Sequence, residues 1–114
     1  MNRHAGLAIG WAWVATVICL SLAPGTPNTG LEGGDKLAHL LSYGVMTYWF
    51  SQFYFHKARL FYALGFVAMG VALEFAQRAT GYRSFDLADM AANTLGVAAG
   101  WAAAALLPLG RSKA

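Results

Sequence analysis

The chain divides into four long apolar runs separated by short polar or turn-forming segments. The runs extend over residues 7–23, 37–55, 60–77 and 87–107. A helix that crosses a bilayer needs about 17–25 predominantly apolar residues, a length that each run supplies or nearly supplies. Prolines and glycines fill the segment between the first two runs, and Pro108 and Gly110 close the last one. The pattern predicts an all-α fold, a polytopic membrane bundle of four transmembrane helices that forms a single domain over residues 1–114.

Composition supports a membrane protein. Hydrophobic residues make up 58% of the chain and charged residues only 11%, whereas a soluble domain carries about 25% charged residues. The sequence pI of about 9.3 raises the alternative of nucleic-acid binding. However, the basic residues stand singly at the ends of apolar runs and form no basic face, so no nucleic-acid partner is expected.

The first run also has the basic start and apolar middle of a signal peptide. Trp11 and Trp13 lie inside it, and three further apolar runs follow. These features favour an uncleaved helix.

The distribution of charge predicts an orientation. With four spans, the N-terminus, the link at residues 56–59 and the C-terminus share one side of the membrane. That side holds five basic residues and no acid: Arg3, Lys57, Arg59, Arg111 and Lys113. The acids fall on or near the other side. The positive-inside rule therefore predicts cytoplasmic termini. Aromatic residues near the link fit a cytoplasmic interfacial belt: Tyr48, Trp49, Phe53, Tyr54 and Tyr62.

Polar residues inside the runs recur at helical spacing. Asp86, Asp89, Asn93, Gly96 and Gly100 advance by three or four residues and so share one face of the last helix. The second helix places Asp35, His39 and Tyr43 on one face beside Lys36, and the third places Glu74 near Gln77. The topology brings these residues to one level near the outer surface. Ionisable residues within a span cost about 2.5–3.5 kcal/mol, so they normally face the bundle interior.

This polar level has several interpretations. In a catalytic or ligand-binding pocket, His39 would be the general acid or base, with Glu74 or Asp89 as its partner. Arg83 would clamp a phosphate or carboxylate. The predicted ligand-binding set is Asp35, Lys36, Tyr43, Gln77, Arg83, Asp86 and Asn93. Alternatively, the same residues only hold the helices together, as the GxxxG spacing of Gly96 and Gly100 would.

Two further alternatives have less support. An oxygen-rich metal site would have only one well-placed histidine, and the chain has no HxxxH or CxxC spacing. Ion conduction would need a second acidic layer deeper in the membrane, and none is evident. No metal and no cofactor is therefore predicted.

In combination, these motifs resemble the VanZ-like family of small bacterial membrane proteins. The family pattern reads DKxxH, then ExxQ, then RxxxxxDxxxNxxG. The matching residues are Asp35, Lys36, His39, Glu74, Gln77, Arg83, Asp89, Asn93 and Gly96. The resemblance covers residues 35–100, which include three of the four predicted helices.

The resemblance implies a protein of the bacterial inner membrane linked to the cell envelope. The family is named for a member associated with resistance to teicoplanin, so a link to glycopeptide resistance is one function to test. The resemblance names no reaction, and whether the chain is an enzyme stays open.

Our hypothesis is that the polar level binds or modifies an envelope lipid or cell-wall precursor. Lys36 and Arg83 would meet its anionic group, while His39, Glu74 and Asp89 would handle protons. The expected partners are membrane lipids and such an anionic envelope component. Exposed small-residue faces would also favour a homo-oligomer, and an assembly protein is the alternative function.

Overall fold

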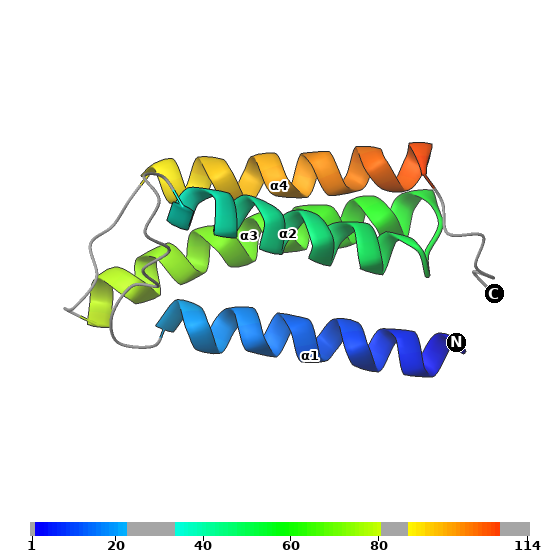
Figure 1. Cartoon of the computed structure of the whole chain (residues 1–114), viewed down its shortest axis with the longest axis horizontal. Coiled ribbons are helices and arrows are strands. Elements are labelled where there is room, and N and C mark those ends of the chain that lie inside the picture. Colours follow the sequence, from blue (N-terminus) through cyan, green and yellow to red (C-terminus); the bar gives the residue numbers. More distant parts are fainter. Residues whose placement is uncertain (1, 23–33, 81–86, 108–114) are drawn as a thin grey trace.

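A computed structural model describes residues 2–22, 34–80 and 87–107, which form four helices and no strand. The helices are α1 (Arg3–Leu22), α2 (Gly34–Ser51), α3 (His56–Thr80) and α4 (Leu87–Leu106). They lie lengthwise beside one another, and α1 and α3 run opposite to α2 and α4 (Figure 1). The all-α prediction and its helix count are confirmed. The prediction that all four helices cross a membrane is not, as described below.

The most extensive contact joins α2 and α4. Gly96 and Gly100 lie directly against the α2 backbone, where an added Cβ would collide with the carbonyl oxygens of Leu40 and Gly44. Backbones can approach this closely only where side chains are absent. The GxxxG spacing therefore serves packing within the bundle.

Helix α1 packs on α2 and α3, and in the described residues it makes no contact with α4. Two indole groups join α1 to α2: Trp13 Nε1 donates to the Ser42 carbonyl at 3.1 Å, and Trp49 Nε1 donates to the Gly6 carbonyl at 2.8 Å. Figure 1 shows α1 on the opposite side of the molecule from α4. The closely packed body is thus α2, α3 and α4, with α1 laid along one side.

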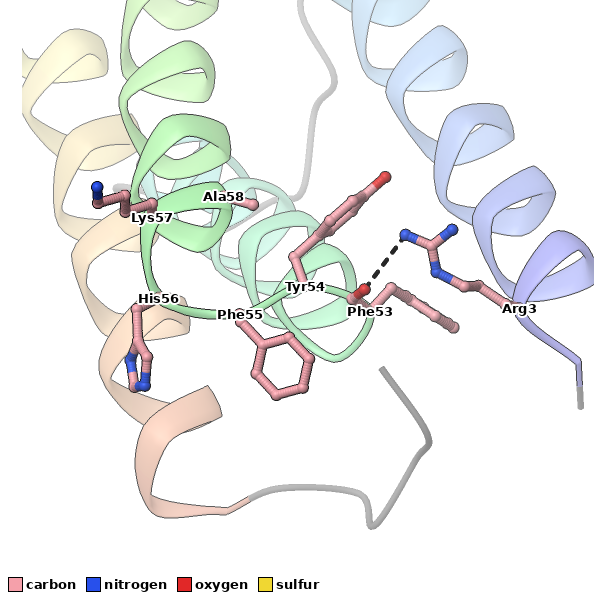
Figure 2. Close-up of a pocket in the computed structure, with 7 residues that line it drawn as sticks. All are labelled: Arg3, Phe53, Tyr54, Phe55, His56, Lys57 and Ala58. Atoms are coloured by element: carbon pink, nitrogen blue, oxygen red, sulfur yellow. Dashed lines mark hydrogen bonds between the residues drawn. The ribbon is translucent and has the colours of Figure 1, made fainter. Parts of the chain in front are cut away.

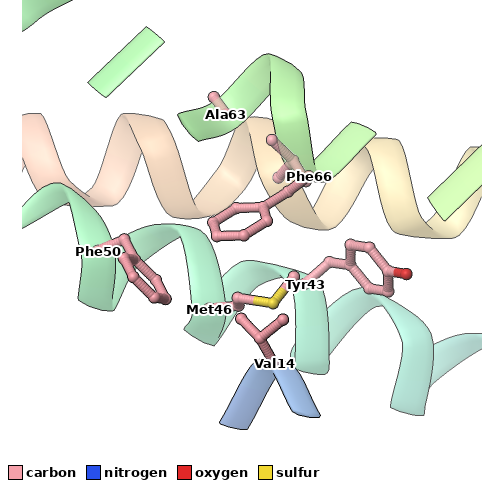
Figure 3. Close-up of a cluster of buried hydrophobic side chains, with 7 residues drawn as sticks. Val14, Tyr43, Met46, Phe50, Ala63 and Phe66 are labelled. Atoms are coloured by element: carbon pink, nitrogen blue, oxygen red, sulfur yellow. The ribbon is translucent and has the colours of Figure 1, made fainter. Parts of the chain in front are cut away.

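The hydrophobic core draws side chains from all four helices. Figure 3 shows Val14 of α1 facing residues of α2 and α3. The buried cluster contains Val14, Tyr43, Met46, Phe50, Ala63, Phe66 and Val97. Aromatic rings extend the core toward residues 52–55. In that region Phe50 stacks on Tyr62, and Tyr62 stacks on Tyr54.

The helices end at different residues from the apolar runs, because polar groups cap them. The Asn2 side chain accepts a hydrogen bond from the Ala5 backbone N–H at 2.7 Å, so α1 starts before its apolar run. Residues 56–59, predicted as a link, instead form the first turn of α3. Arg59 Nε donates to the carbonyls of Ser51 and Tyr54 at 2.8 and 3.1 Å, which caps the end of α2. The actual connection between α2 and α3 is residues 52–55.

The aromatic belt predicted near this connection is partly core. Phe53 is buried, and only Tyr48, Trp49, Tyr54 and Tyr62 keep some exposure. Phe53 packs beneath Gly6 of α1. Its ring therefore fills the space that the missing Gly6 side chain leaves.

By length and composition, α1 and α3 could each cross a membrane, and in the described chain α2 and α4 do not meet the same criteria. A core helix of a soluble protein can be equally apolar, but it would be mostly buried. Here only 22% of the apolar window of α1 and 28% of that of α3 is buried. Large side chains such as Leu20, Phe61 and Leu64 are more than half exposed. Apolar surface on this scale is typical of a protein that contacts lipid or another apolar partner.

Candidate functional site

Three side chains from α2 and α4 meet at the end of the bundle where α2 and α4 begin. Lys36 Nζ lies 2.7 Å from Asp89 Oδ1, and His39 Nε2 lies 3.8 Å from Asp89 Oδ2. Lys36 and His39 are three residues apart on α2, so they share a face toward α4. Asp89 lies in the first turn of α4, where the positive end of the helix dipole favours a carboxylate.

Burial differs sharply among these three residues. The Asp89 side chain is 8% exposed, whereas that of His39 is 16% and that of Lys36 is 33% exposed. The carboxylate is therefore enclosed, and the lysine side chain that neutralises it is partly exposed. The His39 imidazole lies between the two in exposure, beyond hydrogen-bond distance from the carboxylate.

A second group of polar side chains is fully buried and lies toward the middle of the bundle. Tyr43, Glu74 and Asn93 come from α2, α3 and α4, and each is at most 3% exposed. Glu74 lies within electrostatic range of the Tyr43 hydroxyl. Asn93 and the Tyr43 ring both pack against Gly70 of α3, where an added Cβ would lie 3.0 Å from the Asn93 amide nitrogen and 3.3 Å from the ring.

The Asn93 Oδ1 atom is buried and accepts no hydrogen bond from the described residues. Such an acceptor is costly in a closed interior, and buried polar atoms of this kind are usually satisfied by water or a ligand. We call Lys36, His39, Tyr43, Glu74, Asp89 and Asn93 together the polar cluster.

Gln77, predicted to bind a ligand, has a structural partner. Its Nε2 donates to the carbonyl oxygen of Ser21 at 2.7 Å. Ser21 lies in the last turn of α1, where carbonyl groups have no partner within the helix. The Gln77 amide thus joins the end of α1 to α3.

Three of the predicted ligand-binding positions cannot be placed in the polar cluster. Arg83 and Asp86 lie outside the described residues. Asp35 is in the first turn of α2, and its side chain lies outside the described part. The structure therefore assembles Lys36, His39, Tyr43, Glu74, Asp89 and Asn93 from the predicted set and gives Gln77 a partner on α1.

The described residues contain no group of three or more His, Cys, Asp or Glu side chains that could hold a metal ion. The polar cluster has instead one partly exposed cation, one imidazole and enclosed carboxylates. This chemistry suits an anionic group that meets Lys36 and a proton that moves between His39 and a carboxylate.

Sequence reasoning missed Gly70 as a residue that shapes the cluster. It lies seven residues before Gln77 and four before Glu74, and so shares their face of α3. That spacing was the available signal, because a glycine in line with buried polar residues suggests close packing against them.

Comparison with known protein families identifies a match. The family model described as VanZ/LLP1 matches residues 5–108. No curated protein matches the chain. No solved structure matches it either.

Proposed function

The chain belongs to the VanZ/LLP1 family, and from that membership and the polar cluster we propose a function in the bacterial inner membrane. In this proposal the polar cluster binds the anionic headgroup of a cell-envelope lipid or cell-wall precursor. Family membership and the two apolar helices indicate a membrane protein. The ligand, the four spans and the orientation are the proposed part.

The four-span arrangement is supported by the way the helices align. Since α2 and α4 lie lengthwise beside α1 and α3 (Figure 1), all four would occupy the same depth of a bilayer. Several of the polar side chains that lower the hydropathy of α2 and α4 are turned inward. Asp89 and Asn93, for example, are buried. In this proposal both termini are cytoplasmic, and the polar cluster lies near the outer surface.

The observation that supports an anionic ligand is the ion pair between Lys36 and Asp89. Its carboxylate is enclosed, but the Lys36 side chain is one-third exposed and can turn its ammonium group toward a group arriving from outside. A phosphate offers that ammonium group charge-assisted hydrogen bonds. His39, on the same face and close to Asp89, would then exchange a proton with the bound headgroup.

Binding of undecaprenyl pyrophosphate to the purified full-length protein in lipid nanodiscs tests this proposal. Lys36→Met should weaken binding at least about tenfold, because it removes a charge-assisted contact worth about 1.5–3 kcal/mol. Asp89→Asn should leave binding intact or tighten it, because the carboxylate competes with the ligand for Lys36. Arg78→Met removes an exposed cation at the same end of the bundle and serves as the matched control.

The alternative is an assembly protein in which the polar cluster only holds the helices together. The hydrogen bond from Gln77 to Ser21 supports it, because a predicted ligand-binding side chain there joins α3 to α1. In this case Lys36→Met and Asp89→Asn should both lower thermal stability, and neither should change binding relative to Arg78→Met. Equal binding by all three variants would overturn the headgroup proposal.

Family membership is the only support for the proposed link to glycopeptide resistance. The test is to express the chain in a teicoplanin-sensitive bacterium and to measure its susceptibility. We expect any change in susceptibility to disappear when the expressed chain carries Lys36→Met. A susceptibility change that persists in this variant would separate resistance from the polar cluster.

A further inference from the structure

The other end of the bundle contains a pocket of about 530 Å³ where α1 meets the connection between α2 and α3. Its lining residues are Arg3, Phe53, Tyr54, Phe55, His56, Lys57 and Ala58. In Figure 2, Arg3 lies on one side of the connection, while Lys57 and His56 lie on the other. None of these residues belongs to the polar cluster.

Arg3 is only partly satisfied by its protein contacts. One guanidinium nitrogen donates to the Phe53 carbonyl at 3.4 Å, near the limit for a hydrogen bond. The guanidinium lies 5.0 Å from the centre of the Tyr54 ring. Its Nε is buried and has no hydrogen-bond partner among the described residues. A guanidinium has five N–H donors, so donors remain for a ligand in the pocket.

Among the described residues, the charged side chains around the pocket are all positive. Arg3, Lys57 and Arg59 lie in the first turns of α1 and α3, whereas Glu74 lies in the last third of α3 and Asp89 in the first turn of α4. Helices α1 and α3 start at the end of the bundle opposite to the start of α4 (Figure 1). Arg59 is engaged in capping α2. Lys57 is exposed, and α3 begins at His56, so the positive end of its dipole adds to the same field.

The pocket is also aromatic. Phe53, Tyr54 and Phe55 supply much of its wall, and the Phe55 side chain is 61% exposed. Aromatic rings beside cations are typical of the boundary between the hydrocarbon core and the headgroups. A free anion would use only the cations, whereas a phospholipid presents an anionic phosphate next to apolar chains and so matches both parts of the wall.

We infer that this pocket binds an anionic phospholipid, with the phosphate at Arg3 and the start of the acyl chains against the exposed Phe55 ring. Lys57 and His56 strengthen the field at the rim. Basic pockets between membrane helices on the cytoplasmic side are known to take such headgroups. The inference rests on the membrane embedding of the proposed function and not on the ligand of the polar cluster.

Native mass spectrometry of the full-length protein with phosphatidylglycerol or phosphatidylethanolamine tests the inference. The wild-type protein should retain phosphatidylglycerol more strongly. Lys57→Gln should reduce this retention about fivefold, as expected for one basic residue near a lipid surface. Arg3→Gln should reduce it further. Arg78→Gln, which removes an exposed cation at the far end, should leave it unchanged.

Lys57→Gln keeps the test decisive if Arg3→Gln fails to fold, because Lys57 is exposed. Equal retention of the two lipids, or unchanged retention in Lys57→Gln, would overturn the inference. Displacement of phosphatidylglycerol by millimolar inorganic phosphate would also overturn it, by showing a site for free phosphate. The headgroup proposal for the polar cluster is tested separately. It would fail if Lys36→Met had no effect on the binding of undecaprenyl pyrophosphate.

Discussion

Gln77 shows how a single buried amide can be structural in a helix that also carries a candidate site. Its side chain donates to the Ser21 carbonyl at 2.7 Å, although Gln77 is only three residues from Glu74. The contact satisfies a carbonyl group at the end of α1. It also secures α1, the helix laid along one side of the closely packed body, to α3.

We expect Gln77→Met to lower the free energy of unfolding by about 0.5–1.5 kcal/mol, because it removes one hydrogen bond while keeping the side-chain volume. Thermal unfolding in detergent, followed by circular dichroism, measures the change. Binding of undecaprenyl pyrophosphate should stay at the wild-type level. A variant of full stability that no longer binds would instead assign Gln77 to the ligand site.

At the residue scale, the sequence predicted which polar side chains gather but not all of their partners. Helical spacing placed Asp35, His39 and Tyr43 on one face of the second helix, beside Lys36. In the structure, Lys36 and His39 both lie close to Asp89 of α4. The choice of Asp89 as their acid depends on how α2 and α4 are aligned. That alignment is set by contacts between residues far apart in the chain, which spacing within one helix does not contain.

At the scale of elements, the α2–α4 pair depends on the absence of side chains on one stripe of α4. We expect Gly96→Ala to destabilise the fold by about 1–3 kcal/mol, because its Cβ would collide with the Leu40 carbonyl and push the helices apart. Gly65→Ala on α3 is the matched control, since nothing lies within 4 Å of an added Cβ there.

Unfolding midpoints of the two glycine variants measure this difference. Gly65→Ala should be neutral or slightly stabilising, because alanine favours a helix over glycine by about 1 kcal/mol. Equal midpoints for Gly96→Ala and Gly65→Ala would mean that α2 and α4 do not pack through this stripe.

The helices were predictable from the apolar runs, but their ends were not. Asn2 and Arg59 cap helices from outside the apolar runs. Hydropathy assigns such residues to loops because it counts their polarity and not their hydrogen bonds. Phe53 was wrongly assigned to the interfacial belt for a related reason. The exposure of an aromatic ring depends on whether another helix packs against it, as α1 packs against Phe53.

For the whole molecule, the proposed topology predicts opposite accessibility for the two ends of α3. In a Cys19→Ala background, Arg78→Cys should react with a membrane-impermeant maleimide in intact cells. Lys57→Cys should react only after the cells are permeabilised. Both residues are exposed, so protein burial does not limit labelling. The reverse pattern would invert the orientation and place the polar cluster on the cytoplasmic side.

The close α2–α4 pairing has a consequence for how the protein is made. The helices that satisfy the membrane-span criteria, α1 and α3, alternate along the chain with two that do not. During synthesis, α2 emerges with Lys36 and His39 long before α4 supplies Asp89. In the proposed topology, Lys36 and His39 of the second helix would lack the Asp89 carboxylate in the bilayer until the fourth helix arrives. Integration of α2 would therefore be completed only when the last helix leaves the ribosome. A chain that stops before α4 would be a substrate for membrane quality control.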